Sequence, residues 1–342
     1  MKSAKLIVMA AAAIIAAQSC CATKDVSEKV VVAYVTSWSQ VMPDPHYVTH
    51  INYAFGHVND SFDGVRIDNP DRLRAISALK KDHPGLKVMI SIGGWGSGRF
   101  SEMAADPKLR DSFCADCKRV MKEFDLDGID IDWEYPGNGG GAGISESPDD
   151  MANYTLLMKG IREAIGPKAW LTLASACTPR YIDFPSIMEY MDLINLMSYD
   201  MGFGAQFHNA LYSSQYTGEW TTDNSVKAHI EAGVPKEKLV VGIPFYGRGT
   251  RDYRGGHDFR GIYPISDEYI QCWDEDAMVP YLTDQEGNFI FGYEDARSAA
   301  IKCDYINENG LRGGMYWDYN GNDDACTLSN VLSVKILGRE SK

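Results

Sequence analysis

The chain has 342 residues, of which 45% are hydrophobic and 11% aromatic, enough to bury one large core. A single barrel of roughly 250 to 300 residues fits this length better than two domains. Lys and Arg total 33 against 47 Asp and Glu, and the formal charge of -14 argues against nucleic acid and anionic membrane surfaces as partners. A neutral substrate such as a sugar is compatible with that charge.

The first residues have the pattern of an export signal. Lys2 and Lys5 frame the start of an apolar run at 6–17, after which small residues lead to Ser19 and Cys20. Ser19-Cys20 after an alanine-rich run resembles the lipobox of bacterial lipoproteins. The match is loose, because the run offers alanine where that motif more often has leucine. No later segment has the roughly 20 consecutive apolar residues of a membrane-spanning helix.

We therefore predict a signal peptide at residues 1–20, a linker at 21–29 and lipid attachment at Cys20. Simple cleavage without a lipid is the alternative, and Cys21 leaves open which cysteine is used. The protein is expected to be exported and held at a bacterial membrane, in the periplasm or on the cell surface. Its only contact with the membrane would be the N-terminal anchor.

Short β-branched and aromatic runs alternate with helix-like patterns, as in βα units that build a parallel sheet. Eight such runs occur, which is the number that closes a barrel. They are 30–38, 50–58, 86–95, 126–135, 169–177, 192–201, 238–248 and 311–319. Helices are predicted at 70–82, 107–124, 149–165, 222–232, 293–309 and 328–337. The predicted fold is an α/β TIM (β/α)8 barrel that spans residues 30–340.

Two connections between predicted strands depart from this regular alternation. The first, 39–49, is too short and too rich in proline for a regular helix. The seventh, 249–292, is an insertion for which we predict loops and short strands. It could wall one side of a cleft or decorate the rim. The glycine-rich segment 137–147 is predicted to be a flexible loop.

An acidic run at 127–136 carries carboxylates where a buried strand should be apolar. In a strand, Asp130, Asp132 and Glu134 share one face and the intervening apolar residues share the other. Neighbouring carboxylates in a poorly hydrated site cannot all stay ionised, so at least one should hold its proton towards neutral pH. This predicts an acid catalyst. Asp127 points the other way in strict alternation and is predicted to be structural.

In TIM barrels the active site lies at the C-terminal ends of the strands. Aromatic and polar residues gather at those ends here. Aromatic rings suit the C–H faces of a sugar, while carboxylates suit its hydroxyls. The predicted strand ends include Phe55, Trp95, Asp200, Tyr246 and Arg248.

The chain resembles glycoside hydrolase family 18, the chitinase-like retaining hydrolases. The acidic run fits the family pattern Asp-x-x-Asp-x-Asp-x-Glu at Asp127, Asp130, Asp132 and Glu134. The resemblance covers nearly all of residues 30–337. Further family motifs follow in the expected order, namely Ser91-Ile92-Gly93-Gly94, Met197-x-Tyr199-Asp200, His208-Asn209-Ala210-x-Tyr212, the segment Pro244 to Arg248 and the segment Gly313 to Trp317.

The resemblance implies roles for the acidic residues. Glu134 would be the general acid and then the base, Asp132 would orient and stabilise the acetamido group of the substrate, and Asp130 would tune Asp132. Tyr199 would hydrogen-bond the acetamido carbonyl, and Trp317 would form the floor of the subsite before the cleaved bond. The remaining expected substrate contacts are Tyr34, Phe55, Trp95, Tyr135, Met197, Asp200, Tyr246 and Arg248. No cofactor and no metal are expected.

Spacing within the acidic run bears on the mechanism. A usual retaining glycosidase needs its nucleophile and its acid on opposite sides of the bond, about 5 Å apart. Asp132 and Glu134 point the same way from one strand, so direct attack by Asp132 is awkward. Our hypothesis is substrate-assisted catalysis, in which the N-acetyl oxygen of the sugar attacks the anomeric carbon. The rival nucleophile is Asp200.

The predicted function is hydrolysis of β-1,4 bonds after N-acetylglucosamine in chitin or chitooligosaccharides, by a monomer. One alternative is an endo-β-N-acetylglucosaminidase that cuts the chitobiose core of N-glycans. Trp133 favours the chitinase reading, because the N-glycan branch more often has another acid there. An alternative of another class is a chitinase-like lectin, but such proteins usually lack the catalytic acid, and Glu134 is present. The insertion at 249–292 is short for this family, which predicts a shallow cleft and endo-type cleavage or short products.

Overall fold

The computed structural model describes residues 28–342 of the chain. The predicted signal peptide, the lipid-attachment residue Cys20 and most of the predicted linker lie outside the described residues. Within residues 28–342 no helix is long and apolar enough to cross a membrane. The six cysteines in this part of the chain are free.

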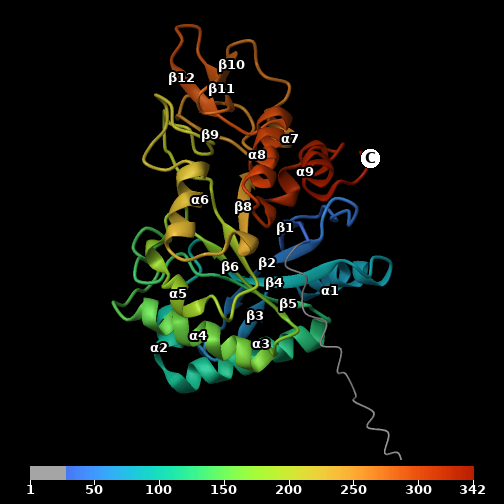
Figure 1. The fold of residues 1–342 in the computed structure, drawn as a ribbon, viewed down its shortest axis with the longest axis vertical. Helices are drawn as coiled ribbons and strands as arrows, with labels where there is room; N and C mark the ends of the chain where they lie inside the picture. The colour runs from blue at the N-terminus through green and yellow to red at the C-terminus, as the bar shows by residue number, and fades with distance from the viewer. Residues whose placement is uncertain (1–27) are drawn as a thin grey trace, which may run out of the picture.

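A closed parallel barrel forms the centre of the molecule (Figure 1). Closure follows from β1, which pairs in parallel with β2 on one side and with β13 on the other. The barrel strands are β1 Val30–Thr36, β2 His50–Val58, β4 Lys87–Gly93, β5 Gly128–Asp132, β6 Trp170–Ser175, β7 Leu193–Leu196, β8 Leu239–Pro244 and β13 Gly313–Trp317. Each of the eight predicted strands is therefore present, and the predicted TIM barrel is confirmed.

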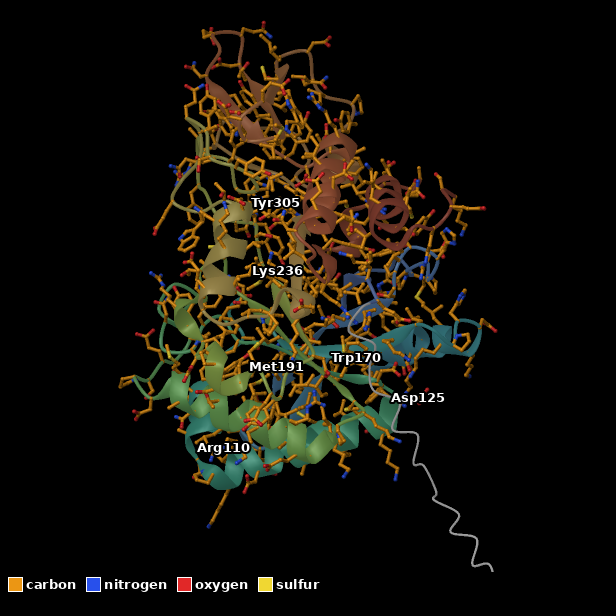
Figure 2. The ribbon with its side chains drawn as sticks, viewed as in Figure 1. Arg110, Asp125, Trp170, Met191, Lys236 and Tyr305 are labelled. Atoms are coloured by element: carbon orange, nitrogen blue, oxygen red, sulfur yellow. The ribbon has the colours of Figure 1, made fainter. Side chains whose placement is uncertain are left out.

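Helices surround the barrel strands. They are α1 Pro70–Ala78, α2 Phe100–Ala105, α3 Pro107–Phe124, α4 Asp150–Ile165, α5 Phe184–Ile187, α6 Thr222–Glu231, α7 Phe259–Ile262, α8 Ala296–Glu308 and α9 Thr327–Leu337. The local sequence determines where several of these helices begin. Proline opens α3 directly after the capping residue Asp106, and Asp295 caps α8, so that helix begins three residues later than predicted. Tyr305 of α8 reaches towards α6, where its hydroxyl donates to Asp223 at 3.0 Å (Figure 2).

The side chains of β5 alternate between the outer core and the barrel interior. Ile129, Ile131 and Trp133 belong to the large core between the barrel and its helices. Asp130 and Asp132 are also buried, but they take the inward-facing positions of the strand. A smaller cluster fills the barrel interior, and its fully buried members include Val32, Leu193, Val240 and Met315. The predicted alternation is thus observed, although β5 ends at Asp132 and not at residue 135 as predicted.

The insertion between β8 and β13 forms a small antiparallel sheet beside the barrel, at the top of Figure 1. Its strands are β9 Arg248–Gly249, β10 Ile270–Asp274, β11 Val279–Thr283 and β12 Phe289–Gly292, in the order β10-β11-β12-β9. Two apolar clusters of its own hold this sheet, one around Phe291 and one that joins Phe289 to Phe207. Short strands were expected here. The short strand β3 Val65–Ile67, antiparallel to β2, was not.

Candidate active site

Asp130 lies at the base of the acid array, fully buried inside the barrel. Four strands each supply it with a hydrogen-bond donor. Oδ2 accepts from the Tyr34 hydroxyl at 3.0 Å and the Ser91 hydroxyl at 2.8 Å. Oδ1 accepts from the Thr172 hydroxyl at 2.5 Å and the Asn195 amide at 3.2 Å. Burial raises the pKa of Asp130, and these hydrogen bonds oppose the rise by favouring the carboxylate.

Asp132 follows two residues later on the same inward face. Its Oδ1 is buried and has no hydrogen-bond partner among the described residues. Burial, together with the charges of Glu134 and Asp130, raises the pKa of Asp132 well above its ordinary value. A buried carboxyl with an unpaired oxygen is energetically unfavourable unless another group hydrogen-bonds to it. Asp132 is therefore set to bind a hydrogen-bond donor that enters the barrel.

Two glycines at the end of β4 make room for Asp132. A Cβ atom on Gly93 would lie 1.9 Å from the carbonyl oxygen of Asp132, so a larger residue cannot fit beside β5. Gly94 has φ of 92° and its backbone N–H donates to the same oxygen at 2.8 Å. The predicted Ser91-Ile92-Gly93-Gly94 motif thus supports two acids, because its serine binds Asp130 and its glycines hold the backbone of Asp132.

Glu134 is the outermost acid of the array. It lies two residues beyond the end of β5 and is only partly exposed. Burial raises the pKa of Glu134 to about 7, the charge of Asp200 adds to this effect, and a hydrogen bond with the Tyr135 side chain opposes it. A carboxyl with that pKa can hold a proton at neutral pH and release it within one reaction step. The predicted acid with a raised pKa is therefore present at Glu134.

Aromatic rings line the interior of the barrel next to these acids. Trp317 stacks on Phe55 with ring centroids 5.4 Å apart, and Tyr34 lies 5.9 Å from Trp317. Met197, Tyr135 and Tyr199 pack in the same apolar cluster as those three rings. This group brings together six of the predicted site residues. The hydroxyl of Tyr34 is engaged by Asp130, so this ring supports the acid array from below.

Trp95 stands at the rim of the barrel and is 63% exposed. Its ring centroid lies 6.5 Å from that of Tyr135. A large exposed indole beside a partly buried tyrosine gives the rim an apolar surface on which a sugar face can stack. Tyr181, which the sequence did not single out, also stacks on Tyr135, with ring centroids 4.7 Å apart.

Asp200 lies on the wall of the barrel formed by β7, four residues beyond the end of that strand, and β6 separates β7 from β5. Arg248 donates hydrogen bonds to both carboxylate oxygens of Asp200, from Nε to Oδ1 at 2.8 Å and from Nη2 to Oδ2 at 3.0 Å. Although burial alone would raise the pKa of Asp200, the hydrogen bonds from His208 and Arg248 lower it well below its ordinary value. Tyr246 packs against this pair, because the Arg248 guanidinium lies 4.8 Å from its ring centroid. Asp200, Tyr246 and Arg248, which were all predicted substrate contacts, therefore form one cluster around an ion pair.

Asp127 and Trp133 lie outside the barrel interior. The Oδ2 of Asp127 accepts from the backbone N–H of Val88 at 2.8 Å and lies 3.1 Å from the ammonium of Lys80. Asp127 thus joins β4 to β5 on the outer side, where the alternation of the strand predicted it. Trp133 is 2% exposed and stacks on Phe100 with ring centroids 5.2 Å apart. Its position in the outer core prevents direct contact with a ligand in the barrel.

Sequence reasoning missed several polar residues that support the acids. Thr172 and Asn195 bind Asp130, and His208 lies behind Asp200. The first two were detectable as polar residues at inward-facing positions of β6 and β7. His208 was noted only as part of a motif, because nothing in its spacing along the chain indicates contact with Asp200.

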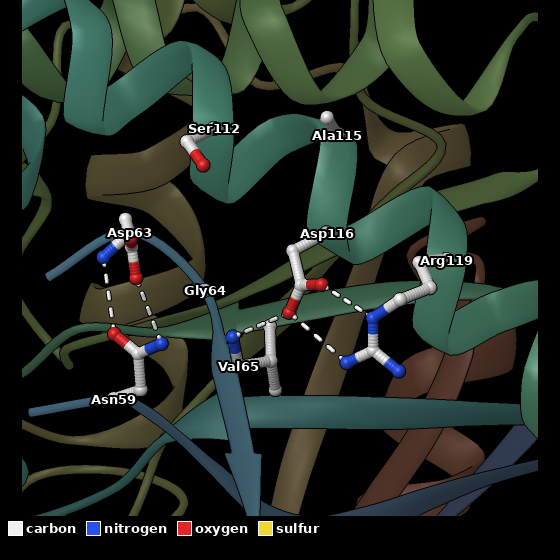
Figure 3. A pocket seen from close by; sticks show the side chains of 8 residues that line it. All are labelled: Asn59, Asp63, Gly64, Val65, Ser112, Ala115, Asp116 and Arg119. Atoms are coloured by element: carbon white, nitrogen blue, oxygen red, sulfur yellow. Dashed lines mark hydrogen bonds and ion pairs between the residues drawn. The ribbon is translucent and has the colours of Figure 1, made fainter. Parts of the chain in front are cut away.

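A surface hollow of about 520 Å³ lies away from the acid array (Figure 3). It is formed by the turn between β2 and β3 together with α3. Its carboxylates are engaged within the fold, since Asp116 accepts from the backbone of Val65 at 2.8 Å and pairs with Arg119, and Asp63 accepts from Asn59. This hollow therefore does not compete with the barrel mouth as the candidate site. Within residues 28–342 no group of side chains has the arrangement of a metal site.

Comparison with known proteins identifies the family. The profile described as Glycosyl hydrolases family 18 matches residues 30–323. The chain belongs to this family. Membership confirms the predicted resemblance, and the match includes every acid of the array.

Relatives within family 18 include Chitinase A1 of Niallia circulans, which is 31% identical over 398 aligned residues. The alignment covers 89% of this chain and 57% of that protein. A family 18 N-acetylglucosaminidase from Paenibacillus barengoltzii superposes with a TM-score of 0.81 at 34% identity, covering 90% of this chain and all of that one. The chitinase ChiW from Paenibacillus sp. str. FPU-7 gives a TM-score of 0.82 at 30% identity, over 92% of this chain and 43% of that chain. The chain thus spans about half the length of Chitinase A1 and of ChiW.

Proposed function

We propose that this protein hydrolyses β-1,4 bonds after N-acetylglucosamine in chitin or chitooligosaccharides, with retention of configuration and with help from the N-acetyl group of the substrate. The observation that carries the proposal is the pairing of Asp132, whose buried Oδ1 has no partner within the described residues, with Glu134, whose pKa is raised to about 7. The first suits the N–H of an acetamido group, and the second suits proton transfer to a glycosidic oxygen.

The reaction follows from these positions. The acetamido N–H donates to Asp132, which turns the acetamido oxygen towards the anomeric carbon. That oxygen forms a bond to the anomeric carbon while the glycosidic C–O bond breaks and Glu134 gives its proton to the leaving oxygen. Glu134, now ionised, takes a proton from water as the water oxygen attacks the anomeric carbon and opens the oxazolinium ring. Two displacements at one carbon retain its configuration.

The hydrogen bonds of Asp200 argue against its role as the nucleophile. Both of its oxygens are held by Arg248, and Oδ1 also lies 3.5 Å from Nδ1 of His208. These partners would have to be displaced before the carboxylate could attack. Its low pKa also makes it a weaker base. Asp200 is better suited to hold the proton on Glu134 through its negative charge.

Two substrates that differ only in their N-acetyl groups test the mechanism. We expect rapid cleavage of a chitooligosaccharide and negligible cleavage of the same oligomer after de-N-acetylation. Proton NMR of the first products should show the β-anomer. Comparable cleavage rates for the two oligomers, or initial α-anomer, would refute substrate assistance. Glu134→Gln should bind the oligomer without cleaving it, which separates the enzyme from a lectin.

The substrate is proposed from the chitinase relatives. The neighbour from Paenibacillus barengoltzii, an N-acetylglucosaminidase, favours release of single N-acetylglucosamine units as a second candidate activity. Mass spectrometry after incubation with chitin hexamer and, separately, with a high-mannose glycoprotein distinguishes the cases. A mixture of internal fragments supports the endo-type cleavage expected from a short insertion. Monosaccharide alone supports the second candidate, and a released N-glycan with an intact polymer would indicate the chitobiose-cleaving alternative.

We further propose export and lipid attachment at Cys20, with the enzyme acting as a monomer. The support is the apolar run that ends at Ser19-Cys20. Growth with a clickable fatty acid should label the wild-type protein and the Cys21→Ser variant but not Cys20→Ser. Labelling that persists in Cys20→Ser and is lost in Cys21→Ser would move the attachment site. Light scattering of the fold without residues 1–27 checks the monomer.

A further inference from the structure

Asp200 is held from behind by a short buried segment, Phe207–Asn209. His208 is fully buried. Its Nδ1 lies 3.5 Å from the Oδ1 of Asp200 and 3.4 Å from the backbone nitrogen of the same residue. With a proton on Nδ1 the ring donates to the carboxylate, and without one it accepts from the backbone N–H. In either form the imidazole fixes the position of Asp200, and the contact between Met201 N–H and His208 carbonyl at 3.1 Å closes the loop between them.

The residues on each side of His208 attach the segment to the insertion. Phe207 is buried in the apolar cluster of the inserted sheet, where its ring lies 5.5 Å from Tyr281 and 5.4 Å from Phe289. Asn209 donates from Nδ2 to the Glu294 carboxylate at 2.9 Å and to the Tyr293 carbonyl at 3.0 Å. The three consecutive residues therefore contact the insertion, Asp200 and the start of α8, in that order.

A buried ion pair anchors this segment. Lys302 of α8 pairs with Glu294, and both side chains are fully inaccessible to solvent. Glu294 also accepts the hydrogen bond from Asn209, so one carboxylate joins α8 to the segment. Buried pairs of this kind contribute little net stability but fix geometry, since either charge left alone is strongly unfavourable. Side-chain contacts thus connect Lys302 to Glu294 and Asn209, the backbone connects Asn209 to His208, and His208 contacts Asp200.

We propose that Phe207–Asn209 is a positioning unit that fixes Asp200 near Glu134 of the acid array and makes the insertion necessary for catalysis without direct contact with substrate. The inference rests on the proposed hydrolase function. It gives the inserted sheet a role besides that of a cleft wall. His208 is a positioning residue in this scheme, because it acts on the reaction only through Asp200.

The pH profile of kcat/KM tests the unit, because Asp200 must stay ionised to favour the proton on Glu134. The ionisable groups that interact with Asp200 are His208, Arg248, Tyr246, Tyr199 and Glu134. In His208→Leu one donor is lost while burial persists, so Asp200 takes up a proton at higher pH. We expect the acid limb of the profile to move up by about one pH unit. His208→Asn keeps a polar group at the position of Nδ1 and should restore the limb.

A matched control is His229, a second fully buried histidine, which contacts Ser175 and Ser225 on the outer layer of the barrel. His229→Leu makes the same chemical change, and we expect lower stability with an unmoved acid limb. The proposal is overturned if His208→Leu leaves the limb in place, or if both variants shift it equally. Should His208→Leu not fold, His208→Gln replaces it, because its longer side chain moves the amide beyond the position of Nδ1.

The anchor is tested by the double variant Glu294→Gln, Lys302→Met, which removes both charges and leaves neither alone. A shift of the acid limb in the same direction as His208→Leu, but smaller, supports the link to α8. An unmoved limb in a folded double variant rejects that link. All variants are assayed on a chitooligosaccharide that wild-type protein cleaves. An inactive wild type would refute the proposed function, whereas an active wild type with unmoved limbs would refute only the positioning unit.

Discussion

Replacing Glu134 by glutamine should stabilise the folded protein and at the same time remove the proton of the proposed general acid. Burial keeps the ionised form of Glu134 unfavourable in the folded state. In the unfolded chain the same carboxyl ionises freely in water. Glutamine has a similar shape but no proton to lose, so the variant escapes the unfavourable ionisation. Activity and stability should therefore change in opposite directions at this position, as at other strained active sites.

The size of the effect follows from the shift in pKa. The ordinary value of 4.5 rises to about 7 in the fold. Each pKa unit corresponds to about 1.4 kcal/mol, so the ionised form is destabilised by about 3 kcal/mol. A carboxyl whose pKa is higher in the folded state than in the unfolded state does not lower the free energy of unfolding at a pH below the unfolded pKa. The free energy of unfolding then falls as the pH rises from the unfolded pKa towards the folded pKa. The difference between variant and wild type should be near zero at pH 4, grow through pH 5 to 7 and level off at about 3 kcal/mol above pH 8.

Urea titrations at pH 4, 6 and 8, followed by tryptophan fluorescence, measure this difference. The exposed residue Glu163 provides the control, because Glu163→Gln makes the same change where the side chain is 68% exposed. That variant should follow the wild type at every pH. An equal stability gain for Glu134→Gln at pH 4 and pH 8, or a loss at pH 8, would refute the assignment of the raised pKa to burial of this carboxyl.

The remaining predictions concern the pH range and the substrate contacts. The alkaline limb of the pH profile of kcat/KM should lie near pH 7, where Glu134 loses its proton. Tyr135→Phe should move this limb to higher pH, because it removes a hydrogen bond that favours the ionised form of Glu134. Tyr181→Phe makes the same change on the neighbouring ring and should leave the limb in place. Asp132→Asn should lower kcat by roughly a hundredfold or more, because a neutral amide oxygen accepts more weakly than a carboxylate and cannot balance the positive charge that develops on the acetamido group; a change confined to KM would contradict that role. Trp317→Ala should raise KM about fivefold through loss of stacking worth roughly 1 kcal/mol. An unchanged KM would contradict the contact. Prolonged treatment with EDTA should leave activity intact, as measured against an untreated sample.

The fold was predictable because each of its signals is local. Alternating strand and helix patterns need only neighbouring residues, and capping residues such as Asp106 and Asp295 mark helix starts within a few positions. The predicted end of the strand at 126–135 was less accurate, because its apolar and acidic alternation continues beyond Asp132, where pairing with the neighbouring strands stops. The strand β3 was missed because its three residues are stabilised by pairing with β2 and carry little pattern of their own.

The candidate site was predictable to the extent that its residues lie on one strand or at strand ends. Alternation predicted the inward face of Asp130 and the outward face of Asp127, and both positions are observed. The contacts of Asp200 could not be derived that way, because Arg248 reaches it from β9 and His208 from a separate loop. The engagement of the Tyr34 hydroxyl by Asp130 likewise depends on two strands that are distant in sequence.

The depth of each residue in the barrel explains why the neighbouring carboxyls Asp130, Asp132 and Glu134 can have different chemistry. At the base, Asp130 is surrounded by donors from four strands, so its charge is fixed within the fold. One step outward, Asp132 still lacks solvent but has lost those donors, and its Oδ1 has no hydrogen-bond partner among the described residues, which is the basis for its proposed contact with the substrate. At the mouth, Glu134 is close enough to water to exchange its proton, yet buried enough to hold it near pH 7. Because side chains alternate along an extended segment, residues 130–134 present a hydrogen-bonded carboxyl, an unpaired carboxyl and a carboxyl with a raised pKa in order towards the barrel mouth, which suits the proposed roles of anchor, binding group and proton donor.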